Sequence, residues 1–165
     1  MIVRRADGAD LPSIATIYNH YVVHSVATFD VDVVTIEDRL AWFEQFDAVH
    51  PLLVCEIDGE VVGYAYYLPF RAKEAYRATK ECTVYVAPDR HSRGVGRALY
   101  GALIDCAREH GVHALVGVLG GENAASAALH TSFGFELVGH LREVGHKLGG
   151  FVDTYYYEKL LETEA

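Results

Sequence analysis

The segment LLVCEIDGEVVGYAYYL, residues 52–68, constrains the fold most, because it consists of two apolar runs joined by the dipeptide Asp58-Gly59. An Asp-Gly pair between two such runs is the strongest short-range sequence signal for a tight β-hairpin. The segment therefore predicts two adjacent antiparallel strands near the middle of the chain.

Hydrophobic periodicity predicts the elements around this hairpin. A first strand covers residues 2–6, a helix starts near Asp7–Asp10, and a second helix starts at Thr35, where Thr-x-x-Asp resembles a capping box. Later strands are expected at residues 83–87, 114–119, 136–141 and 154–160, and later helices at 94–110 and 123–133. A hairpin early and strand–helix alternation late predict an α/β (α+β mixed) fold, with a mixed, mostly antiparallel sheet and helices on both faces. The length fits a single domain over residues 1–165.

Composition restricts the classes of partner. The formal net charge is −9, whereas phosphate backbones and anionic membranes require a broad basic surface, so neither nucleic acid nor a membrane is expected as a partner. No apolar run is long enough to span a membrane and the N-terminus lacks a secretory signal, so the chain is expected to be soluble and cytoplasmic. Cys55, Cys82 and Cys106 are widely spaced and no metal-ligand motif accompanies the histidines, so neither a disulfide framework nor a metal site is expected.

The segment after the strand at 83–87 has the features of a phosphate-binding turn. Gly94 and Gly96 remove side chains from the turn, and a helix begins there with its unpaired N–H groups directed outward. Three flanking arginines add positive charge without requiring a basic protein. The Gly-Lys-Ser/Thr of a Walker loop and the GxGxxG spacing of a dinucleotide fold are both missing. The turn therefore predicts a site for the pyrophosphate of another carrier.

The same stretch, TVYVAPDRHSRGVGRAL, resembles the acetyl-CoA signature of the GNAT superfamily of N-acetyltransferases, Arg/Gln-x-x-Gly-x-Gly/Ala, with His91 at the leading Arg or Gln position. Five blocks in the same order are similar to one branch, the phosphinothricin and the methionine sulfoximine or sulfone acetyltransferases. The blocks are IYNHYVVHSVATFD, HPLLVCEIDGEVVGYAY, FRAKEAYRATKECTVYV, NAASAALHTSFGF and VGHKLGGFVD. The resemblance implies the GNAT fold, acetyl-CoA as cosubstrate, a small amino-acid-like acceptor and a homodimer.

This resemblance assigns the residues that hold the cofactor. The backbone of Val84, Tyr85 and Val86 would pair with the pantetheine amides much as another strand would. The pyrophosphate would lie on the turn formed by His91, Ser92, Arg93, Gly94, Val95, Gly96 and Arg97. Arg90 or Arg93 is expected to compensate for His91.

Acetyl transfer from a thioester to an amine requires a base for the ammonium, a donor for the oxyanion and a proton for the departing thiolate. Glu81 is the candidate base, acting directly or through a water, and the family carries its proposed base at the matching position. A backbone N–H near Thr83–Tyr85 is the expected oxyanion donor.

His130 is the candidate acid. Asn123, Ser126 and His130 are spaced three and seven residues apart, so they lie along one face of a helix and can address one ligand together. In the superfamily this helix borders the pantetheine arm, which assigns Asn123 and Ser126 to the cofactor. The branch has a histidine at the His130 position, and its ordinary pKa suits proton donation near pH 7.

For the acceptor, the resemblance implies that Arg71 and Lys73 hold the carboxylate of an amino acid while its amine faces the base. Further candidates for substrate contact are Phe29, Trp42, Glu81, Cys82 and Thr83. Strand alternation directs the Cys82 side chain away from that of Glu81, so direct attack in a ternary complex is expected. The block VGHKLGGFVD is interpreted as an interface or lid segment.

Two alternatives remain open on the sequence alone. The acceptor could be a polyamine, an aminoglycoside or a protein N-terminus, although Arg71 and Lys73 would repel a cation. The chain could instead be a non-catalytic module that binds acetyl-CoA, against which the presence of Glu81 and His130 argues.

Overall fold

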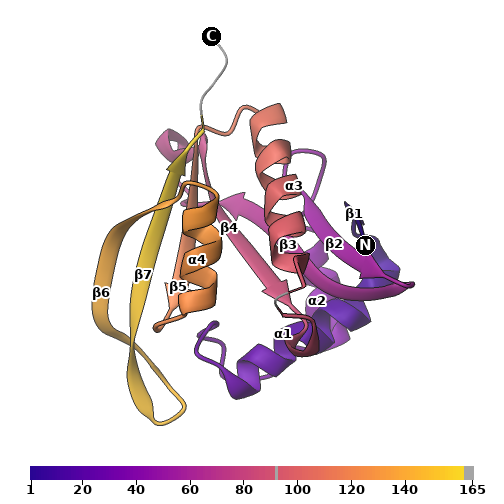
Figure 1. Ribbon diagram of the computed structural model, residues 1–165, viewed down its shortest axis with the longest axis horizontal. Helices are drawn as coiled ribbons and strands as arrows, with labels where there is room; N and C mark the ends of the chain where they lie inside the picture. The colour runs from indigo at the N-terminus through magenta and orange to yellow at the C-terminus, as the bar shows by residue number, and fades with distance from the viewer. Residues whose placement is uncertain (92, 162–165) are drawn as a thin grey trace.

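The computed structural model describes residues 1–91 and 93–161. Seven strands of the described chain form one sheet in the order β1-β2-β3-β4-β5-β7-β6 (Figure 1). The strands are β1 (Ile2–Arg5), β2 (Leu52–Ile57), β3 (Glu60–Pro69), β4 (Thr79–Val86), β5 (Ala114–Gly120), β6 (Glu136–Lys147) and β7 (Gly150–Leu160). Neighbouring strands are antiparallel except β4 and β5, which are parallel. The predicted mixed, mostly antiparallel sheet is therefore confirmed.

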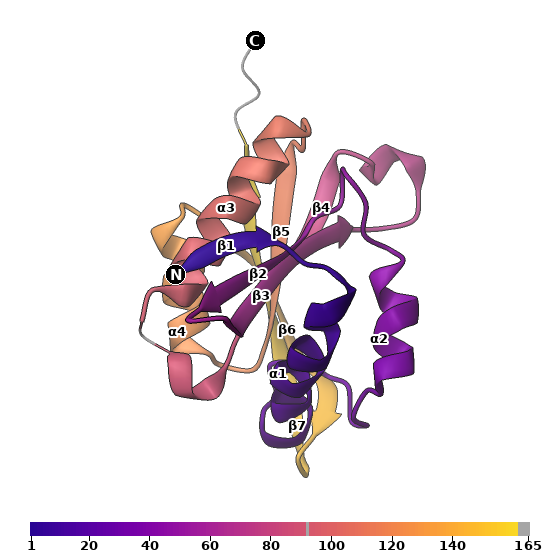
Figure 2. The same ribbon diagram turned by 90° about the vertical axis from the view of Figure 1, so that its right-hand side faces the viewer.

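Helices cover both faces of the sheet, as predicted. They are α1 (Leu11–His24), α2 (Ile36–Phe43), α3 (Val95–Glu109) and α4 (Ala124–Ser132). Figure 2 shows α1 and α2 on one side of β1–β3 and α3 on the other. Each face has its own core: Leu99 of α3 packs with Leu53 on one face, and Ile14 of α1 packs with Val54 on the other.

Two predicted local motifs are present. Asp58 and Gly59 connect β2 to β3 with φ angles of 53° and 82°, the left-handed pair that a type I′ hairpin turn requires. Thr35 caps α2, because its Oγ1 accepts the N–H of Asp38 while the Asp38 carboxylate accepts the N–H of Thr35. Both motifs depend on neighbouring residues only, which is why the sequence predicts them well.

The limits of later strands differ from the predicted ones. β4 begins at Thr79 rather than at the predicted Thr83, so Glu81 lies inside the strand. β6 and β7 are both longer than predicted and meet at a tight turn formed by Leu148 and Gly149, which both have positive φ. The segment 144–153, interpreted as an interface or lid, is therefore the closed end of a β-hairpin.

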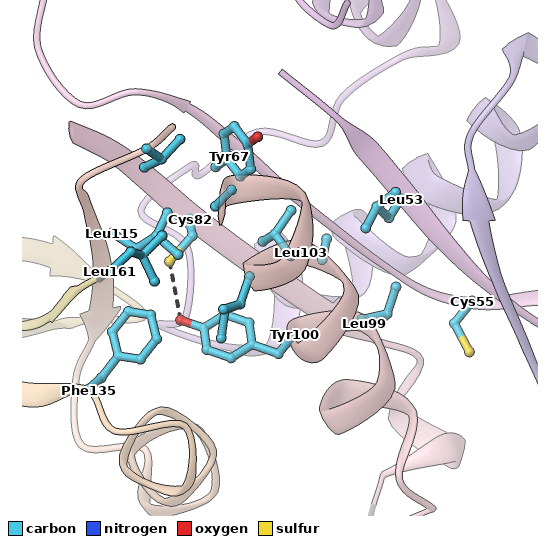
Figure 3. Packing of buried hydrophobic residues seen from close by; sticks show 14 of the residues in the cluster. Leu53, Cys55, Tyr67, Cys82, Leu99, Tyr100, Leu103, Leu115, Phe135 and Leu161 are labelled. Carbon is cyan, nitrogen blue, oxygen red and sulfur yellow. Dashed lines mark hydrogen bonds between the residues drawn. The ribbon is translucent and has the colours of Figure 1, made fainter. Parts of the chain in front are cut away.

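The core beneath α3 fixes the direction in which β4 side chains point. Figure 3 shows Cys82 and Tyr100 directed into this core, with Cys82 Sγ 3.2 Å from Tyr100 Oη. Because successive strand residues face opposite sides, Glu81 and Thr83 face the α1 side of the sheet. The predicted opposition of Cys82 and Glu81 is confirmed.

The parallel strands β4 and β5 are paired only over Thr79–Cys82 and Ala114–Gly117. Beyond these residues β4 continues to Val86 and β5 to Gly120, and the two strands diverge (Figure 1). The divergence opens the sheet between β4 and β5, and this opening positions the site.

Candidate active site

A cleft of about 1040 Å³ occupies the opening between β4 and β5. Its walls come from α1 and the loop after it, β3, β4, the first turn of α3, β5, α4 and the β6–β7 pair. The predicted site residues that line it are Phe29, Glu81, Cys82, Thr83, Val84, Tyr85, Val86, His91, Gly94, Val95, Gly96, Arg97, Asn123, Ser126 and His130. Arg71, Lys73 and Arg93 are not among the lining residues, and Ser92 lies outside the described residues.

The backbone of β4 offers hydrogen-bonding groups to this cleft. Ala87 donates its N–H to Val62 O of β3 at 2.9 Å. Because alternate residues of a strand face opposite neighbours, Val84 and Val86 direct their N–H and C=O groups toward β5. Within the described chain, β5 pairs with neither residue. Of the three residues predicted to pair with pantetheine, two are thus suitably oriented, whereas the backbone of Tyr85 faces β3.

His91, the residue that departs from the family signature, is anchored to α1. Its Nε2 lies 2.8 Å from Tyr21 Oη and 3.3 Å from Val86 O, and Tyr21 Oη donates to the same carbonyl at 2.5 Å. The Val86 carbonyl at the edge of the cleft is therefore engaged by a tyrosine from α1. This contact is long-range in sequence and could not be predicted from the signature.

The turn before α3 is suited to an anion. Gly94 has a φ of 81°, which glycine adopts readily. Among residues 1–91 and 93–161 no side chain caps α3, so within this part of the chain the N–H groups of its first turn remain available. Arg97 is exposed in this turn and lines the cleft. Arg90 also lines the cleft, and it pairs with Glu60 at 2.9 Å and with Asp89 at 3.1 Å, whereas Arg93 is exposed outside the lining.

Asn123 and Ser126 lie in the first turn of α4, beside the cleft. Asn123 Oδ1 accepts the N–H of Ser126 at 2.9 Å, so the asparagine caps the helix. The Ser126 hydroxyl and the Asn123 amide nitrogen remain the groups with which these residues could contact a cofactor.

Glu81 is half-buried and lines the cleft. Burial raises the pKa of its carboxyl above the ordinary value of 4.5, and the positive charge of Arg71 lowers it in part. A carboxyl whose pKa lies nearer to neutrality is a more effective base than a solvated one.

The two cations predicted to hold an acceptor carboxylate are placed differently. Arg71 is exposed, donates from Nη1 to Phe70 O at 2.9 Å and packs on the Phe70 ring at 4.1 Å from its centre. Its charge nevertheless acts on Glu81. Lys73 is exposed ahead of a short 3₁₀ turn and is not among the groups that act on the Glu81 carboxyl. The structure therefore associates Arg71, rather than the pair, with Glu81.

Two predicted substrate contacts require correction. Trp42 packs against the Phe46 and Tyr66 rings at centre distances of 4.6 and 5.4 Å, at the core on the α1 face and outside the cleft lining. The Cys82 side chain is 3% exposed on the α3 side, and burial raises the pKa of its thiol to about 12. Only the backbone of Cys82 can reach a substrate.

His130 is 4% exposed and lies among the rings of Tyr100, Phe135 and Tyr157, at centre distances of 5.0, 5.2 and 5.4 Å. Its Nδ1 lies 2.8 Å from Ser126 O, and because a carbonyl only accepts, Nδ1 carries the proton. Burial lowers the pKa of the ring below its ordinary value of 6.5, so the ring is neutral at pH 7. Nε2 then has no proton to give, which does not fit the acid role predicted for His130.

Several lining residues were not predicted from the sequence. They are Tyr18, Tyr21, Thr28, Tyr66, Val118, Leu141, Val144, Thr154 and Tyr156. Five of them lie in blocks that resemble the branch, but the resemblance assigned them no role: Tyr18, Tyr21, Thr28, Tyr66 and Val144. The other four carry only the alternation of β5, β6 and β7. That signal indicates which face of an element is covered, but not that a cleft covers it.

The site has two ends. At one end the Glu81 carboxylate lies where β4 and β5 separate, and at the other the Gly94 turn leads into the N-terminus of α3. Within residues 1–91 and 93–161, no group of three or more His, Cys, Asp or Glu side chains is arranged to hold a metal ion. None of the helices in this part of the chain is both long and apolar enough to cross a membrane. This fold and this site are of the kind suited to an acyl-CoA-dependent transferase.

The chain belongs to the GNAT family of N-acetyltransferases, because it matches the acetyltransferase (GNAT) domain family over residues 3–156. It is 39% identical over 166 residues to an L-methionine sulfoximine/L-methionine sulfone acetyltransferase of Salmonella typhimurium, covering 100% of this chain and 97% of that protein. The crystal structure of a ribosomal-protein-alanine N-acetyltransferase from Brucella melitensis has a TM-score of 0.94 at 42% identity, covering 98% of this chain and 100% of that one. A phosphinothricin acetyltransferase from Sinorhizobium meliloti, in complex with acetyl-CoA, has a TM-score of 0.93 at 34% identity, covering 97% and 88%. The predicted family is confirmed.

Proposed function

We propose that this protein transfers the acetyl group of acetyl-CoA to the amine of a small amino-acid-like acceptor, of the methionine sulfoximine, methionine sulfone or phosphinothricin type. The observation that carries the proposal is Glu81, a half-buried carboxylate of raised pKa in the cleft whose other end is the Gly94 turn. The names of the Salmonella and Sinorhizobium relatives support this acceptor class, and the acetyl-CoA in the Sinorhizobium structure supports the cosubstrate.

In the proposed reaction, Glu81 takes a proton from the acceptor ammonium, directly or through a water, and the amine lone pair attacks the thioester carbonyl carbon. The new N–C bond forms, the C–S bond breaks, and CoA departs as a thiolate. The nitrogen sheds its second proton to solvent as the neutral amide forms. The N–H of Val84, which faces the gap between β4 and β5, is the proposed donor to the oxyanion. Because Nε2 of His130 is unprotonated, we assign protonation of the thiolate to solvent; a thiolate whose thiol pKa is about 8.5 is a weak enough base to leave first.

The state of Cys82 supports direct attack in a ternary complex. An acetyl-enzyme route would require a nucleophilic thiolate beside the cofactor. Cys82 is the cysteine among the lining residues, but its thiol points into the core beneath α3 and has a pKa of about 12. A thiol in this state is a poor nucleophile near pH 7.

The α-amine of a protein N-terminus is the second candidate acceptor, favoured by the similarity to the Brucella ribosomal-protein-alanine N-acetyltransferase. A polyamine or an aminoglycoside is less compatible with the positive charge of Arg71 near Glu81. A peptide would have to enter the same cleft from its open side.

A thiol-release assay with acetyl-CoA tests the proposal. The panel contains methionine sulfoximine, methionine sulfone, phosphinothricin, a peptide with an N-terminal alanine, and a polyamine. We expect turnover with the amino-acid analogues and little or none with the polyamine. Turnover with the peptide alone would establish the second candidate, and silence across the panel, with acetyl-CoA still bound, would favour a non-catalytic binding module.

We further propose that the protein is a cytoplasmic homodimer. The edge strand β6 and the hairpin end expose large apolar side chains, which favours burial against a second copy. They are Leu137, Val138, Leu141, Val144, Leu148 and Phe151. Light scattering coupled to size-exclusion chromatography should give twice the chain mass, and Phe151→Asp should shift it toward the monomer. The three free cysteines suit a reducing compartment.

A further inference from the structure

The β6–β7 hairpin contacts the loop that follows α1, residues 25–30, which we name the acceptor loop. Lys147 of β6 is 5% exposed, and its Nζ donates to the backbone carbonyls of Thr28 at 2.7 Å and Tyr21 at 3.3 Å. The Tyr21 carbonyl belongs to the last turn of α1, where the helix dipole carries partial negative charge. One buried ammonium group therefore joins α1, the acceptor loop and the hairpin.

Phe29 forms a second link between the acceptor loop and the sheet. Its ring lies against the backbone of Gly145 in β6 and of Gly120 at the end of β5. A Cβ at either glycine would come closer to the ring than real Cβ atoms come to any neighbour. The absence of a side chain at both positions lets the ring pack against the backbone of both strands.

The acceptor loop is also held from α1. Tyr18 Oη is hydrogen-bonded to Thr28 Oγ1 at 2.8 Å and donates to the Asp30 carboxylate at 2.6 Å. Thr28 and Phe29 line the same cleft as Glu81, whereas Lys147 is not among its lining residues. The position of this part of the cleft wall thus depends on a lysine 119 residues further along the chain from Thr28.

We propose that Lys147 and Gly145 are positioning residues for acceptor recognition, which fix Thr28 and Phe29 in the cleft wall and so set the size of acceptor side chain that fits. This inference rests on the proposed function, because it assumes that this part of the cleft receives the acceptor. Burying an ammonium group is costly, and the pairing of β6 with β7 does not require it, since Lys147 pairs with Gly150 through its backbone. The charge is explained chiefly by the Thr28 carbonyl, for which Lys147 is the donor seen in the described residues; an apolar side chain would remove that donor and leave the Tyr21 carbonyl with the N–H of Ser25 alone.

Three variants test the proposal by steady-state kinetics. Lys147→Met keeps an apolar stem and removes the donors, and Gly145→Ala adds a Cβ where the Phe29 ring lies. Gly150→Ala is the matched control, since its Cβ would meet nothing within 4 Å in the same hairpin. We expect the first two variants to raise the acceptor KM by about tenfold or more and to leave the KM for acetyl-CoA within about twofold. The control should change neither constant.

Hydrogen–deuterium exchange reports the acceptor loop without requiring turnover. Lys147→Met should speed amide exchange in residues 25–30 and leave β4 and the start of α3 unchanged. The proposal would be overturned if Lys147→Met showed the same amide exchange in residues 25–30 and the same acceptor KM as the wild type. An equal rise of the KM values for acceptor and acetyl-CoA would also overturn it, because it would indicate that the whole cleft has become less ordered. If the wild type acetylates no amino acid but the loop still responds, the proposed function fails while the positioning of the loop by Lys147 stands.

Discussion

Replacement of Glu81 by Gln is the sharpest test of the chemistry, because it removes the base and preserves the size of the side chain. Loss of a general base lowers the rate by about 10²- to 10⁴-fold, which corresponds to about 2.7–5.4 kcal/mol of activation free energy. The groups proposed to hold acetyl-CoA lie at the other end of β4 and in the turn at Gly94. We therefore expect the Kd for acetyl-CoA to change by less than about twofold, as calorimetry would show.

The pH dependence of the Glu81→Gln loss identifies what the base does. An α-amine with a pKa of about 8 is about one-tenth unprotonated at pH 7 and about nine-tenths unprotonated at pH 9. If Glu81 serves to deprotonate the ammonium, the ratio of wild-type to variant kcat/KM should fall by up to about tenfold over this interval. In the wild type, kcat/KM should decline toward acid through a pKa above 4.5, because burial raises the pKa of this carboxyl.

A thiol-release assay over pH 6–9 with the best acceptor of the panel supplies both measurements. Glu136→Gln, the same chemical change at an exposed position of β6, is the matched control and should leave the profile unchanged. Turnover of Glu81→Gln at the wild-type rate would refute the assignment of Glu81 as base. A loss accompanied by an equal weakening of acetyl-CoA binding would instead indicate a structural role.

Three further substitutions test other parts of the site and the core. Arg71→Ala should raise the acceptor KM, and it should move the acidic limb of kcat/KM to higher pH because the Arg71 charge lowers the pKa of Glu81. The control Arg77→Ala should do neither. An unchanged acceptor KM for Arg71→Ala would exclude a contact between Arg71 and the acceptor carboxylate. Tyr67→Phe should leave the free energy of unfolding in urea unchanged or raise it by up to about 1 kcal/mol, since in the described structure the buried hydroxyl has no partner; a marked loss would contradict this. His130→Gln should lower kcat by less than about a hundredfold, and a larger loss with intact cofactor binding would reinstate the acid role.

The fold was predictable where a few neighbouring residues determine the geometry. The Asp58-Gly59 turn and the Thr35 cap are of this kind, and both occur as expected. The length of β6 was not predictable, because its register against β7 shifts between Leu141 and Gly145 and its side chains are mostly exposed. An irregular, solvent-facing strand lacks the alternation of apolar and polar residues on which a prediction depends.

The two ends of the candidate site differ in the same way. The cofactor end follows from one contiguous strand–turn–helix segment, so its residues could be named from the sequence and most of them line the cleft. The proposed acceptor end is assembled from α1, the acceptor loop, β6 and β7, and contacts such as Lys147 with Thr28 join residues far apart in the chain. Trp42 illustrates the limit, since its residue type suits a pocket wall equally well as the core position that it occupies.

His130 shows how environment changes the chemistry that a residue type suggests. The packing of α4 on β5 places its Nε2 against the backbone of Gly117, the last residue of β5 that pairs with β4. The same packing surrounds the ring with aromatic side chains and commits its one proton to Ser126 O. Proton flow in the proposed reaction is then one-sided, because Glu81 accepts a proton inside the cleft and the thiolate gains one only after the C–S bond has broken. The rate should therefore rise with pH until the amine is free, without a descending limb from loss of the His130 proton.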